Sequence, residues 1–218
     1  MMAAKLAKRE EGFYKRLHSF STADEWSEKQ VKARKKLKTQ GVYKVEEILA
    51  VRQKKDSERE FLIKWDSWGS EYNSWEIESH ILDKSVIETF EKPNPEPKTV
   101  LAHVELIRNA IDGGLTDSLQ SDTTIIFNHA VFRHIFGGRG KVCSKETYAL
   151  SAQDFPRRYF PLGWDMTYRR RGTVRKITYP IQLHPFLSRS RQMYNKDGSK
   201  KERRWIQKLT ISFRKHNI

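Results

Sequence analysis

The sequence predicts an α+β fold class, with two small domains in series. Three short segments rich in β-branched and aromatic residues lie between positions 42 and 77, and a helical pattern follows at 83–91. Alternating prolines at 93–98 then favour an extended spacer. We therefore expect a basic, partly helical extension over residues 1–40, a first domain over 41–92, a linker over 93–98, and a small mixed, β-leaning basic domain over 99–218.

Composition excludes several classes of protein. The 218 residues contain no run of 18 or more apolar residues, so no membrane span is expected. The single cysteine, Cys143, rules out an intrachain disulfide and a cysteine-based zinc site, and it favours a reducing compartment.

Charge is divided unevenly along the chain. Residues 1–40 carry a net charge of +6, residues 41–92 carry −4, and residues 93–218 carry +13. Basic flanks suggest a polyanionic partner such as DNA or RNA, and an acidic middle suggests a basic peptide. Chromatin offers both partners. The alternative is that the charge only keeps the protein soluble.

The N-terminal extension has one helix signal. Residues 1–20 are expected to be irregular or weakly helical. Thr22 and Glu25 match a capping box, so a polar helix is predicted from about Ala23 to Lys38, with Gly41 ending it. The basic run 32–38 fits a nuclear import signal or a phosphate contact, and equally a solvated helix face.

The first domain is expected to contain three strands and a helix. The strands are predicted at 42–51, 60–65 and 74–77, a turn at 54–58, a loop at 67–73 and the helix at 83–91. Val86, Ile87 and Phe90 share one face of that helix. Trp75 is assigned to the core because it lies inside the third strand.

The second domain gives weaker signals. A helix is predicted from Val100 to Ile111, with Leu101 among the residues of its apolar face and Gly113-Gly114 ending it. Segments 123–127 and 130–136 fit helix or strand. Residues 173–183 favour a strand, 195–198 a turn, and 205–213 a strand with alternate residues on one side.

Four fragments of the first domain together resemble the chromodomain family. They are Val42–Leu49, Glu60–Trp68, Asn73–Glu76 and Val86–Phe90, in the family's order and spacing. The resemblance covers residues 42–91. It implies a curved three-stranded antiparallel sheet with a C-terminal helix across it, and binding of a methylated lysine on a histone tail.

The resemblance places an aromatic cage at Tyr43, Trp65 and Trp68. Methylation removes hydrogen-bond donors from the lysine ammonium but leaves its charge, and ring faces accept such a cation without hydrogen bonds. Tyr43 and Trp65 also fit the core of an ordinary small β domain, which is the alternative.

The resemblance also implies that the peptide inserts as a strand between residues 41–45 and residues 76–82. Val45 matches a position that lines a small pocket for the residue two before the methyl-lysine. Tyr72 replaces a glutamate common in the family, which favours trimethyl over monomethyl lysine. The expected peptide-binding residues are Val42, Val45, Tyr72, Glu76 and His80. His80 and Leu82 stand where heterochromatin-type members often carry Asn and Asp.

Basic and aromatic residues alternate in the second domain, which suits phosphate contacts and base stacking. A basic surface over an aromatic core is the equal alternative. The expected nucleic-acid contacts are Arg169, Arg170, Arg171, Lys200, Lys201, Arg203 and Arg204.

Signals for catalysis are weak. His129 and His134 are five residues apart, not the helical four of a metal-binding pair, and Gly137–Gly140 lacks the Lys-Ser/Thr ending of a phosphate loop. We therefore expect a nuclear, non-enzymatic chromatin reader without metal or cofactor. The alternatives are a DNA- or RNA-binding chromatin protein whose chromodomain does not recognise methyl-lysine, and a scaffold whose C-terminal domain binds another protein.

Overall fold

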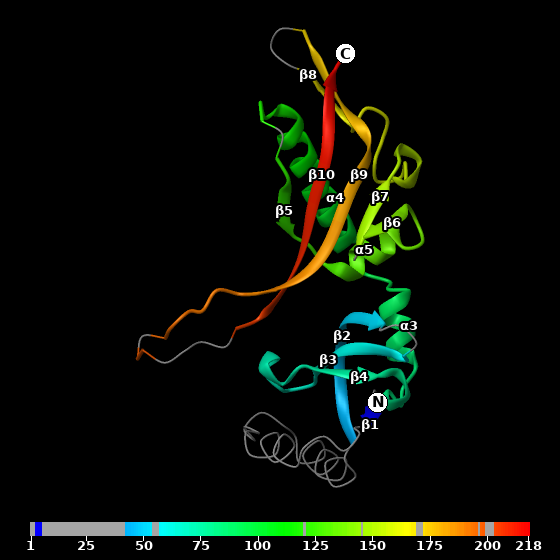
Figure 1. Ribbon diagram of the computed structural model, residues 1–218, viewed down its shortest axis with the longest axis vertical. Helices are drawn as coiled ribbons and strands as arrows, with labels where there is room; N and C mark the ends of the chain where they lie inside the picture. Colours follow the sequence, from blue (N-terminus) through cyan, green and yellow to red (C-terminus); the bar gives the residue numbers. More distant parts are fainter. Residues whose placement is uncertain are drawn as a thin grey trace. The chain divides into compact units, whose positions relative to one another are not determined.

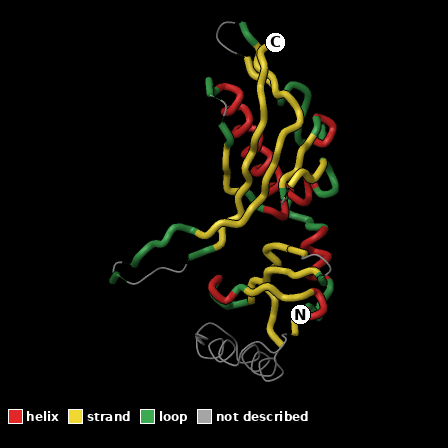
Figure 2. Tube along the Cα trace, in the orientation of Figure 1, coloured by secondary structure: helices red, strands yellow, loops and turns green. Residues whose placement is uncertain are grey.

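The computed structural model describes residues 3–5, 42–53, 57–119, 121–144, 146–168, 172–195, 197–198 and 203–218 (Figure 1). The helix predicted at 23–38, its basic run and most of the turn at 54–58 lie outside these residues. The described residues form an α+β fold, as predicted, and divide into two compact units. The first unit takes in strand β1 to helix α3 together with Arg191–Arg204, and the second takes in 92–190 and 205–218. Figure 2 distinguishes the described helices, strands and loops.

The first unit contains the predicted three-stranded antiparallel sheet. Strands β2 (Val42–Gln53), β3 (Arg59–Trp65) and β4 (Ser74–Ile77) are neighbours in that order. Register shifts interrupt the β2–β3 pairing twice, and such bulges bend a strand. Short 3-10 turns η1 (Ser70–Tyr72) and η2 (Glu78–His80) flank β4, and helix α3 (Ser85–Glu91) follows.

A further strand joins this sheet at β2. Strand β1 (Ala3–Lys5) pairs antiparallel with residues 42–44. The prediction of irregular or weakly helical structure was therefore wrong for these three residues. Three residues carry no periodic signal, and a strand this short exists only through pairing with another strand's edge.

The core of the first unit lies between the sheet and α3. Phe61, Ile63 and Ile81 are fully buried and join the three predicted apolar residues of α3 in one cluster. The assignment of Trp75 to the core was wrong. Its ring is half-buried, and the Arg52 guanidinium lies 4.1 Å from the ring centroid. Because strand side chains alternate, β4 buries Ser74 and Glu76 instead.

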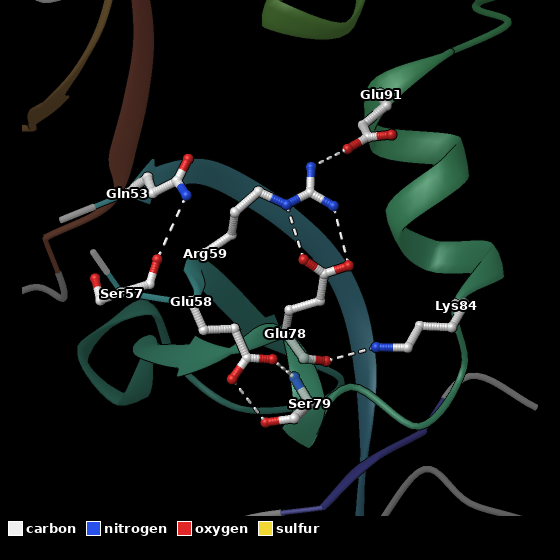
Figure 3. A network of polar contacts seen from close by, with 8 residues as sticks. All are labelled: Gln53, Ser57, Glu58, Arg59, Glu78, Ser79, Lys84 and Glu91. Carbon is white, nitrogen blue, oxygen red and sulfur yellow. Dashed lines mark hydrogen bonds and ion pairs between the residues drawn. The ribbon is translucent and has the colours of Figure 1, made fainter. Parts of the chain in front are cut away.

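A polar network ties the start of β3 to η2 and α3 (Figure 3). The Arg59 guanidinium donates to both carboxylate oxygens of Glu78 at 2.8 and 2.9 Å, and also to Glu91. This hydrogen-bonded pairing holds the pKa of Glu78 below its usual value. Both partners are partly exposed, so the network fixes the position of α3 more than it adds stability.

The second unit is a six-stranded antiparallel sheet with two helices. Its strand order is β5-β10-β9-β7-β6, and β8 pairs with β9. The strands are β5 (Thr123–Ile126), β6 (Lys141–Ser144), β7 (Thr147–Leu150), β8 (Met166–Tyr168), β9 (Val174–Arg189) and β10 (Trp205–Asn217). The helices are α4 (Pro97–Thr116) and α5 (His129–Phe136), with a 3-10 turn η3 (Ala152–Asp154) after β7.

One apolar cluster holds both helices against β9 and β10. Helix α4 buries Val100, Val104, Ile107, Ile111 and Leu115, a clean helical stripe. Leu101, which was assigned to that face, is 59% exposed instead. Strand β10 buries Leu209, Ile211 and Phe213, which confirms the predicted alternation over 209–213, whereas residues 205–208 are all half-buried.

The prediction that Gly113 and Gly114 end helix α4 was wrong, because the helix continues to Thr116. A Cβ atom on Gly114 would lie 2.9 Å from the Phe213 ring, whereas one on Gly113 would meet nothing within 4 Å. Gly114 therefore permits close packing of α4 on β10, while Gly113 only weakens the helix.

The two glycines form a matched pair for a stability test. Gly113→Ala should raise the free energy of unfolding by about 0.5–1 kcal/mol through helix propensity. Gly114→Ala should be about 1–3 kcal/mol less stable than Gly113→Ala, because the new methyl group overpacks against Phe213. Urea denaturation of the two variants measures both values. Equal stabilisation by both substitutions would contradict the packing role of Gly114.

Candidate functional site

The aromatic residues predicted for the cage belong to one cluster in the first unit. Tyr43 is near the start of β2, Trp65 ends β3, and Trp68 follows in the next turn. The ring centroids of Tyr43 and Trp65 are 6.1 Å apart at 68°. Trp68 packs edge to face on Tyr72 of η1, at 5.5 Å. The residues Tyr43, Trp65 and Trp68 are only 7%, 2% and 7% exposed.

Lys64 organises the turn between the two tryptophans. Its ammonium donates to the carbonyls of Trp65 at 3.0 Å and Trp68 at 2.7 Å, and it pairs with Glu46 at 2.7 Å. Ser67 has a positive φ of 63°, which reverses the chain within three residues. Sequence reasoning missed Lys64, since a lysine inside a strand usually indicates only a solvent-facing position.

The same turn is fastened to the start of β2. The Asp66 amide donates to the Lys44 carbonyl at 3.0 Å, and the Lys44 ammonium pairs with the Asp66 carboxylate at 3.2 Å. These two contacts join the residue after Trp65 to the residue after Tyr43. The relative position of the two rings is therefore fixed by backbone as well as by packing.

A buried polar chain connects Trp65 to two of the predicted peptide-binding residues. The Trp65 indole Nε1–H donates to Ser74 Oγ at 3.1 Å, and the Ser74 hydroxyl donates to Glu76 Oε1 at 2.6 Å. His80 Nδ1 lies 3.4 Å from the other carboxylate oxygen of Glu76. Ser74 was not identified from the sequence. Strand β4 can bury the polar side chains of Ser74 and Glu76 because each of them has a hydrogen-bond partner inside the unit.

The other predicted peptide-binding residues have different surroundings. Val45 is buried and lies opposite Trp65 in the β2–β3 register. Val42 is half-buried and lies opposite Lys5 of β1. Tyr72 is half-buried against Trp68 and so supports that ring.

The predicted nucleic-acid contacts are described only in part. Arg169, Arg170, Arg171, Lys200 and Lys201 lie outside the described residues. Arg203 and Arg204 are exposed, and they belong to the first unit. The Ser70 hydroxyl of η1 donates to the Arg203 carbonyl at 2.7 Å. Arg203 therefore contacts the same 3-10 turn that carries Tyr72, which the sequence did not indicate.

The histidines noted in the sequence serve structural roles. His129 Nε2 lies 3.0 Å from the Lys208 carbonyl, and burial lowers the pKa of this histidine. His134 Nδ1 lies 3.2 Å from the Pro93 carbonyl. Across the described residues, no group of three His, Cys, Asp or Glu side chains could hold a metal ion. No helix in the described part of the chain is long and apolar enough to cross a membrane.

Comparison with known proteins identifies the first unit. Residues 43–93 match the family model of the Chromo (chromatin organisation modifier) domain, so this part of the chain is a chromodomain. Chromobox protein homolog 2 of Mus musculus and of Homo sapiens are each 42% identical to the chain over 55 residues. Chromobox protein homolog 8 of Homo sapiens is 35% identical over 67 residues.

The similarity is confined to that domain. Each of these matches covers 25% of the chain, and only 10% of the length of homolog 2 or 17% of homolog 8. No solved structure matches the chain.

The hydrogen bond from Trp65 to Ser74 predicts a measurable coupling between the stability effects of substitutions at these two residues. Ser74→Ala should lower the free energy of unfolding by about 1–3 kcal/mol, because it leaves a buried indole N–H without its acceptor. Trp65→Phe removes that N–H. The double variant should therefore be less destabilised than the two single effects combined, by about 0.5–1.5 kcal/mol. Denaturant unfolding of the four proteins measures the coupling, and additive effects would show that the hydrogen bond contributes nothing.

Proposed function

We propose that this chromodomain binds a methylated lysine on a histone tail, with Tyr43, Trp65 and Trp68 as the walls of an aromatic cage. The observation that supports it best is the fixed pairing of Tyr43 with the Trp65–Trp68 turn. The rings of Tyr43 and Trp65 meet at a steep angle, and the Lys44–Asp66 contacts hold both elements together. Rings at steep angles can present several faces to a single cation.

The energetics of such a cage suit a methylated ammonium. Each ring face contributes about 0.5–2 kcal/mol, with the larger values in desolvated sites. Three faces could supply much of the roughly 8 kcal/mol that corresponds to micromolar affinity. Tyr72 brings a ring against Trp68 in place of a carboxylate. Lower methylation states keep a donor that a carboxylate would accept, so the site should prefer trimethyl over monomethyl lysine.

Main-chain pairing would provide the rest of the affinity. The peptide would add as a strand to the start of β2, with Val42, Val45, Tyr72, Glu76 and His80 nearest to it. Glu76 is buried and hydrogen-bonded through Ser74 to the Trp65 indole. Negative charge at this place, and the net charge of −4 over residues 41–92, favour a basic tail.

This proposal makes the protein a non-enzymatic, nuclear chromatin reader. The relatives that share its chromodomain are named as chromobox proteins, and the domain itself is described as a chromatin organisation modifier. The basic residues after position 92 would provide contacts to nucleic acid or to a chromatin protein.

The cage can be tested by changing only the ligand's charge. A trimethyl-lysine histone peptide should bind the full chain at least about tenfold more tightly than the same peptide with a neutral tert-butyl isostere, because ring faces attract the cation. Isothermal titration calorimetry measures both affinities. Equal affinity would leave only shape recognition and would refute the cation–π mechanism.

Matched tryptophan variants complete this test. Trp68→Ala should weaken trimethyl-peptide binding at least about tenfold, by the loss of one wall. Trp75→Ala removes a half-buried ring stacked on Arg52 and should leave binding within about twofold, since surface effects of this kind are small. Trp65 and Trp68 are both buried, at 2% and 7% exposed, so truncating either ring would also cost about 3–5 kcal/mol of stability, and binding is compared only under conditions in which urea denaturation shows the variant to be folded.

A second function, binding of DNA or RNA, is favoured by the basic charge. Residues 93–218 carry a net charge of +13, and Arg203 and Arg204 are exposed. If both contact phosphates, replacing them by alanine should reduce the slope of log K against log salt by about 1.8 on duplex DNA. Fluorescence anisotropy from 50 to 300 mM salt measures that slope. An unchanged slope would remove these two arginines from the interface.

A further inference from the structure

The chain's own N-terminal strand pairs with the β2 edge proposed for the peptide. Strand β1 lies beside the start of β2 (Figure 1), with Ala3 opposite Lys44, Ala4 opposite Tyr43 and Lys5 opposite Val42. The pairing is antiparallel, which gives main-chain hydrogen bonds of the kind a bound peptide would make. A bound peptide and strand β1 cannot both pair with the same backbone groups of β2.

The residues of β2 that pair with β1 are among those that the proposed peptide would use. Val42 is an expected peptide-binding residue, Tyr43 is a proposed cage wall, and Lys44 precedes Val45.

Burial of the cage rings is an independent observation. Tyr43, Trp65 and Trp68 are at most 7% exposed in this arrangement of the chain. A cage that is ready to receive a cation must leave ring faces accessible to solvent. The three residues are therefore closed to solvent in the arrangement in which β1 is paired with β2.

We infer that β1 is an internal ligand of the chromodomain, which must leave β2 before a methylated tail can bind. The inference rests on the proposed function. It gives residues 3–5 a regulatory role: any partner or modification that draws this segment away from β2 opens the reader.

The loss of peptide affinity caused by this autoinhibition can be calculated from the fraction of molecules in which β1 is paired. The apparent dissociation constant equals the intrinsic constant divided by the fraction of open protein. If β1 is paired in about 90% of molecules, the full chain binds its peptide about tenfold more weakly than a chain with β1 released.

Paired substitutions within the full chain test this without changing its charge. Successive N–H groups of a strand point to opposite sides, so one of the two at positions 3 and 4 faces β2. Ala3→Pro/Ala4→Pro removes both donors, whereas Ala3→Ser/Ala4→Ser keeps both and stays small. The proline variant should bind a trimethyl-lysine histone peptide about tenfold more tightly than the natural chain. The serine variant should match the natural chain.

A second readout does not depend on methyl-lysine binding. In native-state hydrogen exchange, amides of residues 42–44 should exchange faster in the proline variant than in the serine variant. Faster exchange without any peptide binding in either variant would uphold the β1 pairing and refute the proposed function. Equal exchange and equal peptide affinity in both variants would overturn the internal-ligand inference.

Discussion

The attachment of the Trp65–Trp68 turn to the start of β2 is the constraint on which the rest of the first unit depends. Two contacts between Lys44 and Asp66 make it, one through the backbone and one through the side chains. Lys64 holds the turn itself by its two carbonyl contacts. These polar contacts fix the backbone beneath three aromatic rings that come from two separate chain segments and share one cluster.

The same region combines a structural role with the proposed binding role. The rings of Tyr43 and Trp65 belong to the apolar cluster that stabilises a small domain, so the core alternative raised by the sequence and the cage do not exclude each other. The buried chain from Trp65 through Ser74 to Glu76 gives the indole one orientation. An ordered ring loses less entropy when a ligand arrives, which is the physical basis of preorganisation.

Much of the fold could be predicted from the sequence, and the failures have physical reasons. Strands β2 to β4 and helix α3 follow from β-formers and helical spacing. Trp75 was misplaced because alternation in a four-residue strand depends on partners that only the fold reveals, here Ser74 with the Trp65 indole. Helix α5 could have been distinguished from a strand by Asn128, whose side chain caps the amides of Ala130 and Val131. Gly114 looked like a helix end because its contact with Phe213 is distant in sequence.

The candidate site was harder to predict than the fold. Tyr43, Trp65 and Trp68 could be proposed as cage residues only through the chromodomain resemblance, and β1 could not be predicted because its pairing spans almost 40 residues of sequence.

In the proposed cage, three ring faces enclose a methylated cation, and ring currents would report this directly. In a titration of the full chain with a trimethyl-lysine histone peptide, proton NMR follows the nine equivalent methyl protons of the ligand. Ring faces shield protons that lie above them, so this resonance should move upfield on binding, and the indole N–H signals of Trp65 and Trp68 should shift while that of Trp75 stays in place. A bound peptide whose methyl resonance does not move would contradict the aromatic cage.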